Sequence, residues 1–74
     1  MGLTIKPREM VKFLEANGYH FFRAKGGSHH IYSNGAHCVP IPIHGNRDFG
    51  EEFIRMILTE TGISKADLLK YLRR

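Results

Sequence analysis

The most constraining feature of this sequence is a pair of prolines two residues apart in an apolar run, Val-Pro-Ile-Pro-Ile at residues 39–43. Alternate residues of a strand point to opposite faces, so Val39, Ile41 and Ile43 share one face and should contribute to a core. Proline has no N–H to give to a neighbouring strand, and both missing donors fall on the same flank. The strand expected from Ala36 to His44 is therefore an edge of a small sheet.

Two shorter segments upstream are expected to complete the sheet. Tyr19 to Ala24 is rich in aromatic residues and has the length of a strand, and His29 to Ser33 supplies the next strand. Asn34-Gly35 predicts a hairpin between the second and third strands, because both central residues of a type I′ turn need positive φ. If consecutive strands pair with each other, as in a β-meander, the second strand in the sequence lies at the centre of the sheet. Regular alternation in the first strand would place Tyr19, Phe21 and Arg23 on one face and His20, Phe22 and Ala24 on the other.

Three helices are expected around this sheet. The first has Pro7 in its opening turn, where the missing N–H is not needed, and ends at Asn17-Gly18 with glycine as the left-handed cap. The second runs from Glu51 to Thr61, and Gly62 caps it. A capping-box pattern at Ser64–Asp67 opens a short third helix. The order α-β-β-β-α-α predicts an α+β fold, with a three-stranded antiparallel sheet and the helices on one face.

Length and charge narrow the classes of protein that this chain can be. A chain of 74 residues builds one small core, so residues 1–74 are expected to form a single domain. The formal net charge of +4 points to an anionic partner, either nucleic acid or an acidic protein. No apolar run approaches the roughly 18 residues of a membrane span. The single Cys38 cannot form an internal disulfide and no signal-peptide core is visible, so a cytoplasmic location is expected.

The segment with the most chemistry is Lys-Gly-Gly-Ser-His-His-Ile-Tyr at residues 25–32. Gly26 and Gly27 lack a Cβ, so the backbone there can take positive φ and a large partner can approach closely. Histidine is the side chain that gives or takes a proton near neutral pH. A proton-transfer group beside cations and bare backbone N–H groups suits a phosphodiester substrate, although a Gly-Gly-Ser turn before a strand is also common loop chemistry.

Other kinds of site find less support in the sequence. The chain has five histidines, but they show no metal-ligand spacing such as His-x-x-His, and Cys38 is the single thiol. A cysteine in the middle of a strand is usually an inert small hydrophobic residue. Phosphate-binding glycine motifs and a paired-carboxylate motif are also lacking. Histidine acid–base chemistry and plain binding therefore remain as the two alternatives.

Four segments together match a known pattern. They are the opening helix closed by Asn-Gly-Tyr at 17–19, the run Arg-Ala-Lys-Gly-Gly-Ser-His-His-Ile-Tyr at 23–32, the run Val-Pro-Ile-Pro-Ile-His-Gly-Asn at 39–46, and the helix Phe-Ile-Arg-Met-Ile-Leu at 53–58 ended by Thr-Gly-Ile at 61–63. Through them the chain, from Pro7 to about Ile63, resembles the HicA toxins of prokaryotic toxin–antitoxin pairs. These toxins are small, metal-independent ribonucleases that cleave mRNA.

The resemblance carries several expectations. It implies a fold like the double-stranded RNA-binding domain, which agrees with the element order predicted above. It also implies that His29, the first histidine after Gly-Ser, is catalytic, and that a HicB-type antitoxin neutralises the protein. No cofactor or metal is implied, and mRNA is the implied substrate.

The remaining site residues are predicted to bind RNA around His29. Lys25, Ser28 and the N–H groups of Gly26 and Gly27 would stabilise the charge that develops on phosphate. Two alternatives from other classes stay open: a non-catalytic RNA-binding module, and a protein-interaction domain whose basic face meets an acidic partner. The full set of predicted RNA-binding residues is Arg23, Lys25, Gly26, Gly27, Ser28, His30, His44 and Arg47.

Overall fold

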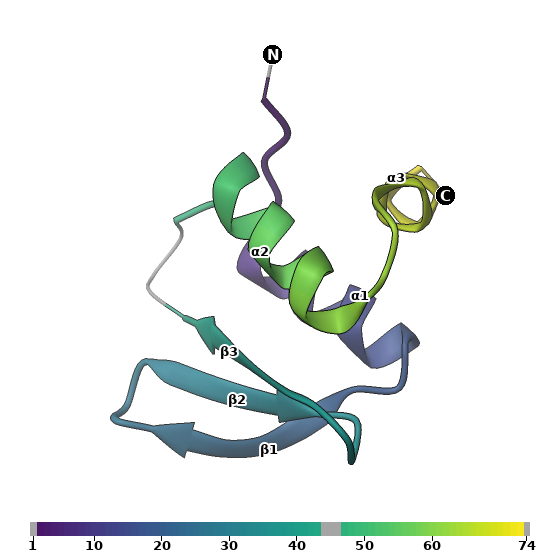
Figure 1. The fold of residues 1–74 in the computed structure, drawn as a ribbon. Coiled ribbons are helices and arrows are strands. Elements are labelled where there is room, and N and C mark those ends of the chain that lie inside the picture. The colour runs from purple at the N-terminus through teal and green to yellow at the C-terminus, as the bar shows by residue number, and fades with distance from the viewer. Residues whose placement is uncertain (1, 44–46, 74) are drawn as a thin grey trace.

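The computed structural model describes residues 2–43 and 47–73. The three strands form one antiparallel sheet in the order β1-β2-β3, and the helices lie on one face of it (Figure 1). The expected α+β fold is therefore confirmed. In chain order the elements are α1 (Pro7–Ala16), β1 (His20–Lys25), β2 (His29–Ser33), β3 (Cys38–Pro42), α2 (Glu51–Thr61) and α3 (Lys65–Leu72).

Strand β3 is an edge of the sheet, as its two prolines predict. The N–H of Ile43, just beyond the strand, donates to the carbonyl of Ser28 over 2.6 Å, which shows that Ile43 directs its backbone toward β2. Residues two apart in a strand face the same side, so the odd-numbered residues of β3 bond to β2. Pro40 and Pro42 therefore turn their missing donors away from the sheet, and β2 is central.

The two outer strands differ in extent from the prediction. β1 starts and ends one residue later than expected, at His20 and Lys25, and the described part of β3 is the shorter span Cys38–Pro42. The expected end at His44 lies outside the described residues. At the other end, the side chain of Asn34 explains the late start of β3, because its Oδ1 accepts from the N–H groups of Ala36 and His37 over 2.9 and 2.7 Å.

The same side chain replaces the predicted type I′ turn between β2 and β3. Gly35 has a φ of +96°, but no described residue other than glycine has positive φ, so Asn34 does not take the conformation that a type I′ turn requires. Instead the connection is a four-residue loop closed by the Asn34 N–H and the His37 carbonyl. Asparagine favours this outcome because its short amide mimics a backbone acceptor two residues on.

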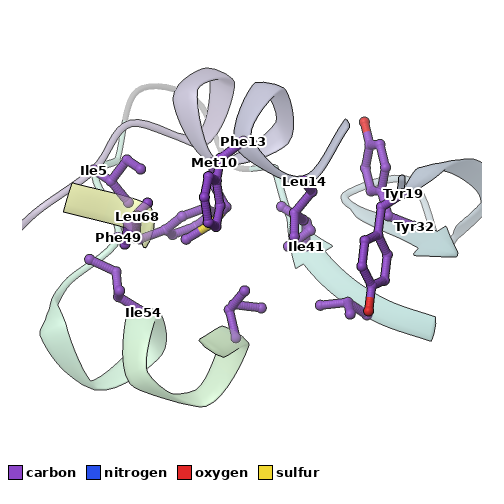
Figure 2. Packing of buried hydrophobic residues seen from close by; sticks show 12 residues of the cluster. Ile5, Met10, Phe13, Leu14, Tyr19, Tyr32, Ile41, Phe49, Ile54 and Leu68 are labelled. Carbon is purple, nitrogen blue, oxygen red and sulfur yellow. The ribbon is translucent and has the colours of Figure 1, made fainter. Parts of the chain in front are cut away.

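The core lies between the helices and the sheet, and both α1 and α2 pack against β3. Figure 2 shows Met10 and Phe13 of α1 and Ile54 of α2 among the buried side chains of this cluster. Val39 and Ile41 are fully buried, and Ile43 packs against the cluster, which confirms the predicted core face of the third strand.

The ends of the helices follow the predicted signals. Gly18 after α1 and Gly62 after α2 have φ of +90° and +75°, so glycine serves as the left-handed residue at both places. The hydroxyl oxygen of Ser64 accepts from the N–H of Asp67 over 3.1 Å, which is the predicted cap of α3. Among the described helices, none has the length and apolar character needed to cross a membrane.

Candidate active site on the uncovered face of the sheet

The buried residues of β3 determine which way each side chain of the sheet points. Val39 and Ile41 lie in the core, and their direct partners on β2 are Tyr32 and His30. Directly opposite residues of antiparallel strands share a face, so these partners also belong to the helix-covered face. The opposite face, called the uncovered face below, carries the remaining residues of β2: His29, Ile31 and Ser33.

A β-bulge in β1 changes the alternation predicted for this strand. Pairing with β2 proceeds from Phe21 directly to Arg23, so Phe22 is an extra residue without a partner in the register. Because a bulge of one residue reverses the alternation, Phe21 lies on the helix-covered face and Arg23 on the uncovered face. The prediction that these two residues share a face is therefore wrong. The same shift separates His20 from Ala24, which the sequence had also placed together.

The bulge brings the predicted catalytic residue and two cations to one face. Lys25 is the direct cross-strand partner of His29, which sets their Cβ atoms roughly 5 Å apart. Arg23 lies two residues earlier on the same face, and all three side chains are exposed. Within the described residues neither cation forms an ion pair, so both can meet an anionic ligand. The uncovered face therefore presents His29 beside two positive charges.

The turn that joins β1 to β2 is built on its two glycines. Gly26 and Gly27 have φ of +65° and +71°, a region that side-chain-bearing residues rarely adopt. The N–H of Ser28 donates to the Gly26 carbonyl over 2.6 Å, which makes Gly27 the centre of a tight three-residue turn of positive φ. A Cβ at either glycine would meet no atom within 4 Å, so the space outside the turn is open.

The backbone N–H groups of this turn are suited to binding an anion. The Ser28 N–H and carbonyl are both used within the fold, the latter by the N–H of Ile43. In the described part of the chain, the N–H groups of Gly26 and Gly27 donate to no carbonyl. Backbone N–H groups in successive residues of a turn form concave sites for anions. The turn therefore adds donors to the positive edge formed by Lys25.

His30 lies on the other face from His29, as the alternation predicts. Its ring packs edge-on against the ring of Phe21, with centroids 5.3 Å apart and planes at 78°. The side chain lies on the helix-covered face and is half-buried there. The structure therefore does not bring His30 together with His29 and Lys25.

The two remaining predicted contacts lie after β3. His44 is outside the described residues. Arg47 is exposed, and no described contact joins it to the turn between β1 and β2. Its neighbour Asp48 lies 3.8 Å from Lys6 in an exposed ion pair. The structure thus groups Arg23, Lys25 and His29 on the uncovered face, beside the turn of Gly26, Gly27 and Ser28.

Two buried tyrosines have pKa values shifted by the core. Burial raises the pKa of Tyr19 above its ordinary value of 10.0, and the charges of Cys38 and Glu60 add to the effect. Burial likewise raises the pKa of Tyr32, with a further contribution from Glu15. Both phenols therefore stay neutral at physiological pH and serve as core residues.

Two further observations concern ligands other than RNA. Across residues 2–43 and 47–73, no three His, Cys, Asp or Glu side chains come together in a group that could hold a metal ion. One hollow, of about 650 Å³, runs along α1 and is lined by residues such as Lys6, Arg8 and Lys12. A second hollow of about 260 Å³ lies by α2. Neither contains a residue that the sequence predicted for the site.

Two phenylalanines of β1 were not predicted to have a surface role. Phe21 and Phe22 are 53% and 62% exposed, although aromatic residues in a small domain are usually buried. Every residue of β1 is exposed, because this strand lies farthest from the helices (Figure 1). The adjacent pair Phe-Phe was itself the available signal, since regular alternation cannot bury two consecutive side chains in a sheet covered on one face.

Comparison with known proteins adds one finding. Residues 7–63 match the family model described as HicA toxin of bacterial toxin-antitoxin, which covers more than half of the 74 residues. Neither the curated proteins nor the solved structures that were searched gave a match. The matched span runs from the first residue of α1 to just beyond the cap of α2, and it includes the whole sheet and its uncovered face. The chain therefore belongs to the HicA toxin family.

Proposed function

We propose that this toxin is a metal-independent endoribonuclease that cleaves mRNA with His29 as its general base. The observation that carries the proposal is the cross-strand pair of Lys25 and His29 on the uncovered face, beside a turn with two glycines of positive φ. A phosphodiester needs a proton acceptor for the attacking hydroxyl and positive charge for the phosphate oxygens. His29 offers the proton acceptor, and Lys25 with the turn offers the positive charge, all within one hairpin.

The proposed reaction is an internal transesterification. His29 takes the proton of the ribose 2′-OH, and the 2′-oxygen attacks the adjacent phosphorus. The bond from phosphorus to the 5′-oxygen breaks, which leaves a cyclic phosphate on one fragment and, after proton uptake from solvent, a 5′-OH on the other. Lys25, the Ser28 hydroxyl and the N–H groups of Gly26 and Gly27 would stabilise the extra negative charge of the pentavalent intermediate.

The surroundings of the pair favour a polymer substrate. The uncovered face is an open surface with Arg23 further along β1, so a strand of RNA can cross it while several phosphates meet cations. Arg47 and His44 are proposed as outlying RNA contacts, whereas His30, on the other face, is not. A single histidine contributes roughly 10²–10⁴-fold in rate, which suits a slow toxin better than a fast digestive nuclease.

The toxin is proposed to act in the cytoplasm and to be neutralised by an antitoxin of the HicB type. Membership of a toxin–antitoxin family supports an antitoxin partner. The formal charge of +4 favours an acidic protein in that role.

Replacement of His29 by alanine tests the catalytic assignment. The side chain is exposed at a junction between turn and strand, so His29→Ala should change the free energy of unfolding by about 0.5 kcal/mol or less. RNA cleavage and growth arrest should nevertheless fall by roughly two orders of magnitude or more. Cleavage of a labelled RNA, with denaturation of the same preparation, measures both quantities. Cleavage by the unmodified protein should persist in EDTA.

His30→Ala is the matched control, because it removes the same side chain from the adjacent position on the other face. It should keep most of the cleavage activity and should still bind RNA. Loss of cleavage in His30→Ala with full activity in His29→Ala would reverse the assignment. An unmodified protein that binds RNA but does not cleave it would support the non-catalytic RNA-binding module instead.

A further inference from the structure

The two edges of the sheet differ in their ability to accept another strand. An edge strand presents unpaired N–H and C=O groups, to which a strand from another protein can bond. On β3 the prolines at positions 40 and 42 remove two of the outward donors. β1 has no proline, and all six of its residues are exposed. The open edge of this sheet is therefore β1.

The register identifies the backbone groups that β1 directs outward. Because the Ser28 carbonyl bonds to Ile43 beyond β3, the even-numbered residues of β2 give their backbone groups to β3, and the odd-numbered residues give theirs to β1. The odd-numbered residues are paired with His20, Arg23 and Lys25. Phe21 and Ala24 are paired with even-numbered residues, so their N–H and C=O groups point away from the sheet.

The side chains of β1 indicate what kind of strand fits this edge. Phe21 and Phe22 are 53% and 62% exposed, and Phe21 is held in place by edge-on contacts with His30 and Tyr32. Arg23 and Lys25 give the strand two positive charges and it contains no acidic residue. An apolar and acidic strand would therefore be complementary in both hydrogen bonding and charge.

We propose that the antitoxin adds a β-strand to the free edge of β1 and extends the toxin's sheet from three strands to four. The backbone of Phe21 and Ala24 supplies the hydrogen bonds, apolar side chains of the added strand cover Phe21 and Phe22, and its carboxylates meet Arg23 and Lys25. An acidic strand in this place lies next to the cations of the uncovered face, so it competes with RNA. The inference rests on the proposed antitoxin partner but not on the catalytic role of His29.

A second copy of the toxin is a poorer occupant of this edge. Pairing of β1 with itself would bring two copies of Arg23 and Lys25 into one short ladder, without a carboxylate in either strand. Like charges in facing strands are destabilising. The positive charge of the strand therefore favours an acidic partner.

The test is Ala24→Pro, which removes one outward donor and mimics the protection found on β3. Since the Ala24 N–H is not needed within the sheet, the variant should keep the fold and the RNA cleavage of the unmodified toxin. Its affinity for purified antitoxin should fall by about 10-fold or more, the equivalent of one lost hydrogen bond. Ala24→Val is the matched control, because it enlarges the side chain and keeps the N–H, and it should bind antitoxin as before.

Hydrogen exchange of the unmodified toxin provides a second measurement that needs no variant to fold. The amides of Phe21 and Ala24 should exchange rapidly in the free toxin and at least about 10-fold more slowly in the antitoxin complex. Unchanged exchange at both amides, or equal antitoxin affinity in Ala24→Pro and Ala24→Val, would overturn the proposal. Protection of these amides by single-stranded RNA but not by antitoxin would overturn it in favour of RNA. Protection that grows with toxin concentration alone would do so in favour of a second copy.

Discussion

Tyr19 and Tyr32 are buried phenols next to the sheet, and their ionisation links stability to pH. The pKa of each is raised in the folded state, chiefly by burial. A group with a raised folded pKa stabilises the fold fully below its unfolded pKa, and this contribution is lost as the pH rises through the folded pKa. For these tyrosines the loss begins near pH 10 and continues above it.

We therefore expect the free energy of unfolding to fall steeply at alkaline pH. Tyr32→Phe removes one of the two phenols and leaves the ring in the core, so the variant should lose less stability than the unmodified protein between about pH 8 and about pH 11. Urea denaturation at the two pH values measures the difference. An equal loss in both proteins would show that the phenol of Tyr32 does not contribute to the alkaline transition.

Single residues also show where sequence-based prediction succeeds. His29 and His30 were placed on opposite faces by the alternation of a regular strand, and the register confirms this. The faces of Phe21 and Arg23 were predicted wrongly, because the bulge at Phe22 inserts one residue into the alternation. Such a bulge leaves no distinct mark in the amino acids that form it, and it is set by the twist and pairing of the strands.

Among the elements, the turn between β1 and β2 depends on the conformation of Gly27. Its φ of +71° is disfavoured for a residue with a Cβ, whereas the added atom itself would meet nothing within 4 Å. Gly27→Ala should therefore cost about 1–2 kcal/mol through backbone strain, without a clash. The turn should also relax away from its present shape, so cleavage of RNA should fall more than RNA binding does.

Gly50→Ala is the matched control for this prediction. A Cβ added at Gly50 would also meet open space, but the φ of −86° at this residue is one that alanine adopts readily. Thermal denaturation of both variants compares the two positions, and Gly50→Ala should be close to neutral. A similarly small effect at Gly27 would show that the turn adapts to alanine without strain.

The elements were predicted best where a covalent property decides the outcome. Proline lacks an N–H, and this identified β3 as an edge, after which the meander order placed β2 at the centre. The hairpin between β2 and β3 was predicted correctly, but its turn type was not, because Asn34 has two ways to make a turn, through positive φ or through its side chain. The side chain bonded to Ala36 and His37, and the sequence pattern does not distinguish the two.

At the scale of the whole molecule, the charge of +4 should govern binding to RNA. If Arg23, Lys25 and Arg47 neutralise three phosphates of a single strand, the logarithm of the affinity should fall with the logarithm of salt concentration at a slope of about −2. Fluorescence anisotropy with a labelled RNA across a series of salt concentrations measures the slope. Arg23→Gln should reduce its magnitude by about 0.7. An affinity that does not change with salt would contradict the nucleic-acid interface.

The position of the uncovered face was only partly accessible from the sequence. The element order predicted helices on one face of the sheet, and the structure agrees. Both α1 and α2 pack against β3, however, and β1 is left exposed along its whole length. The helices lie over β3 and not over β1 because of how they pack on the twisted sheet. This placement is a property of the complete core and not of any single segment.

The unequal edges of the sheet also limit how copies of this protein can assemble. Growth of an extended sheet or a filament needs two compatible edges on every copy, one to receive and one to be received. Here one end of the sheet is closed by the prolines at positions 40 and 42. Edge-to-edge association therefore stops after a single pairing event. A small protein with an exposed edge strand is in this way protected from open-ended polymerisation, even at high concentration.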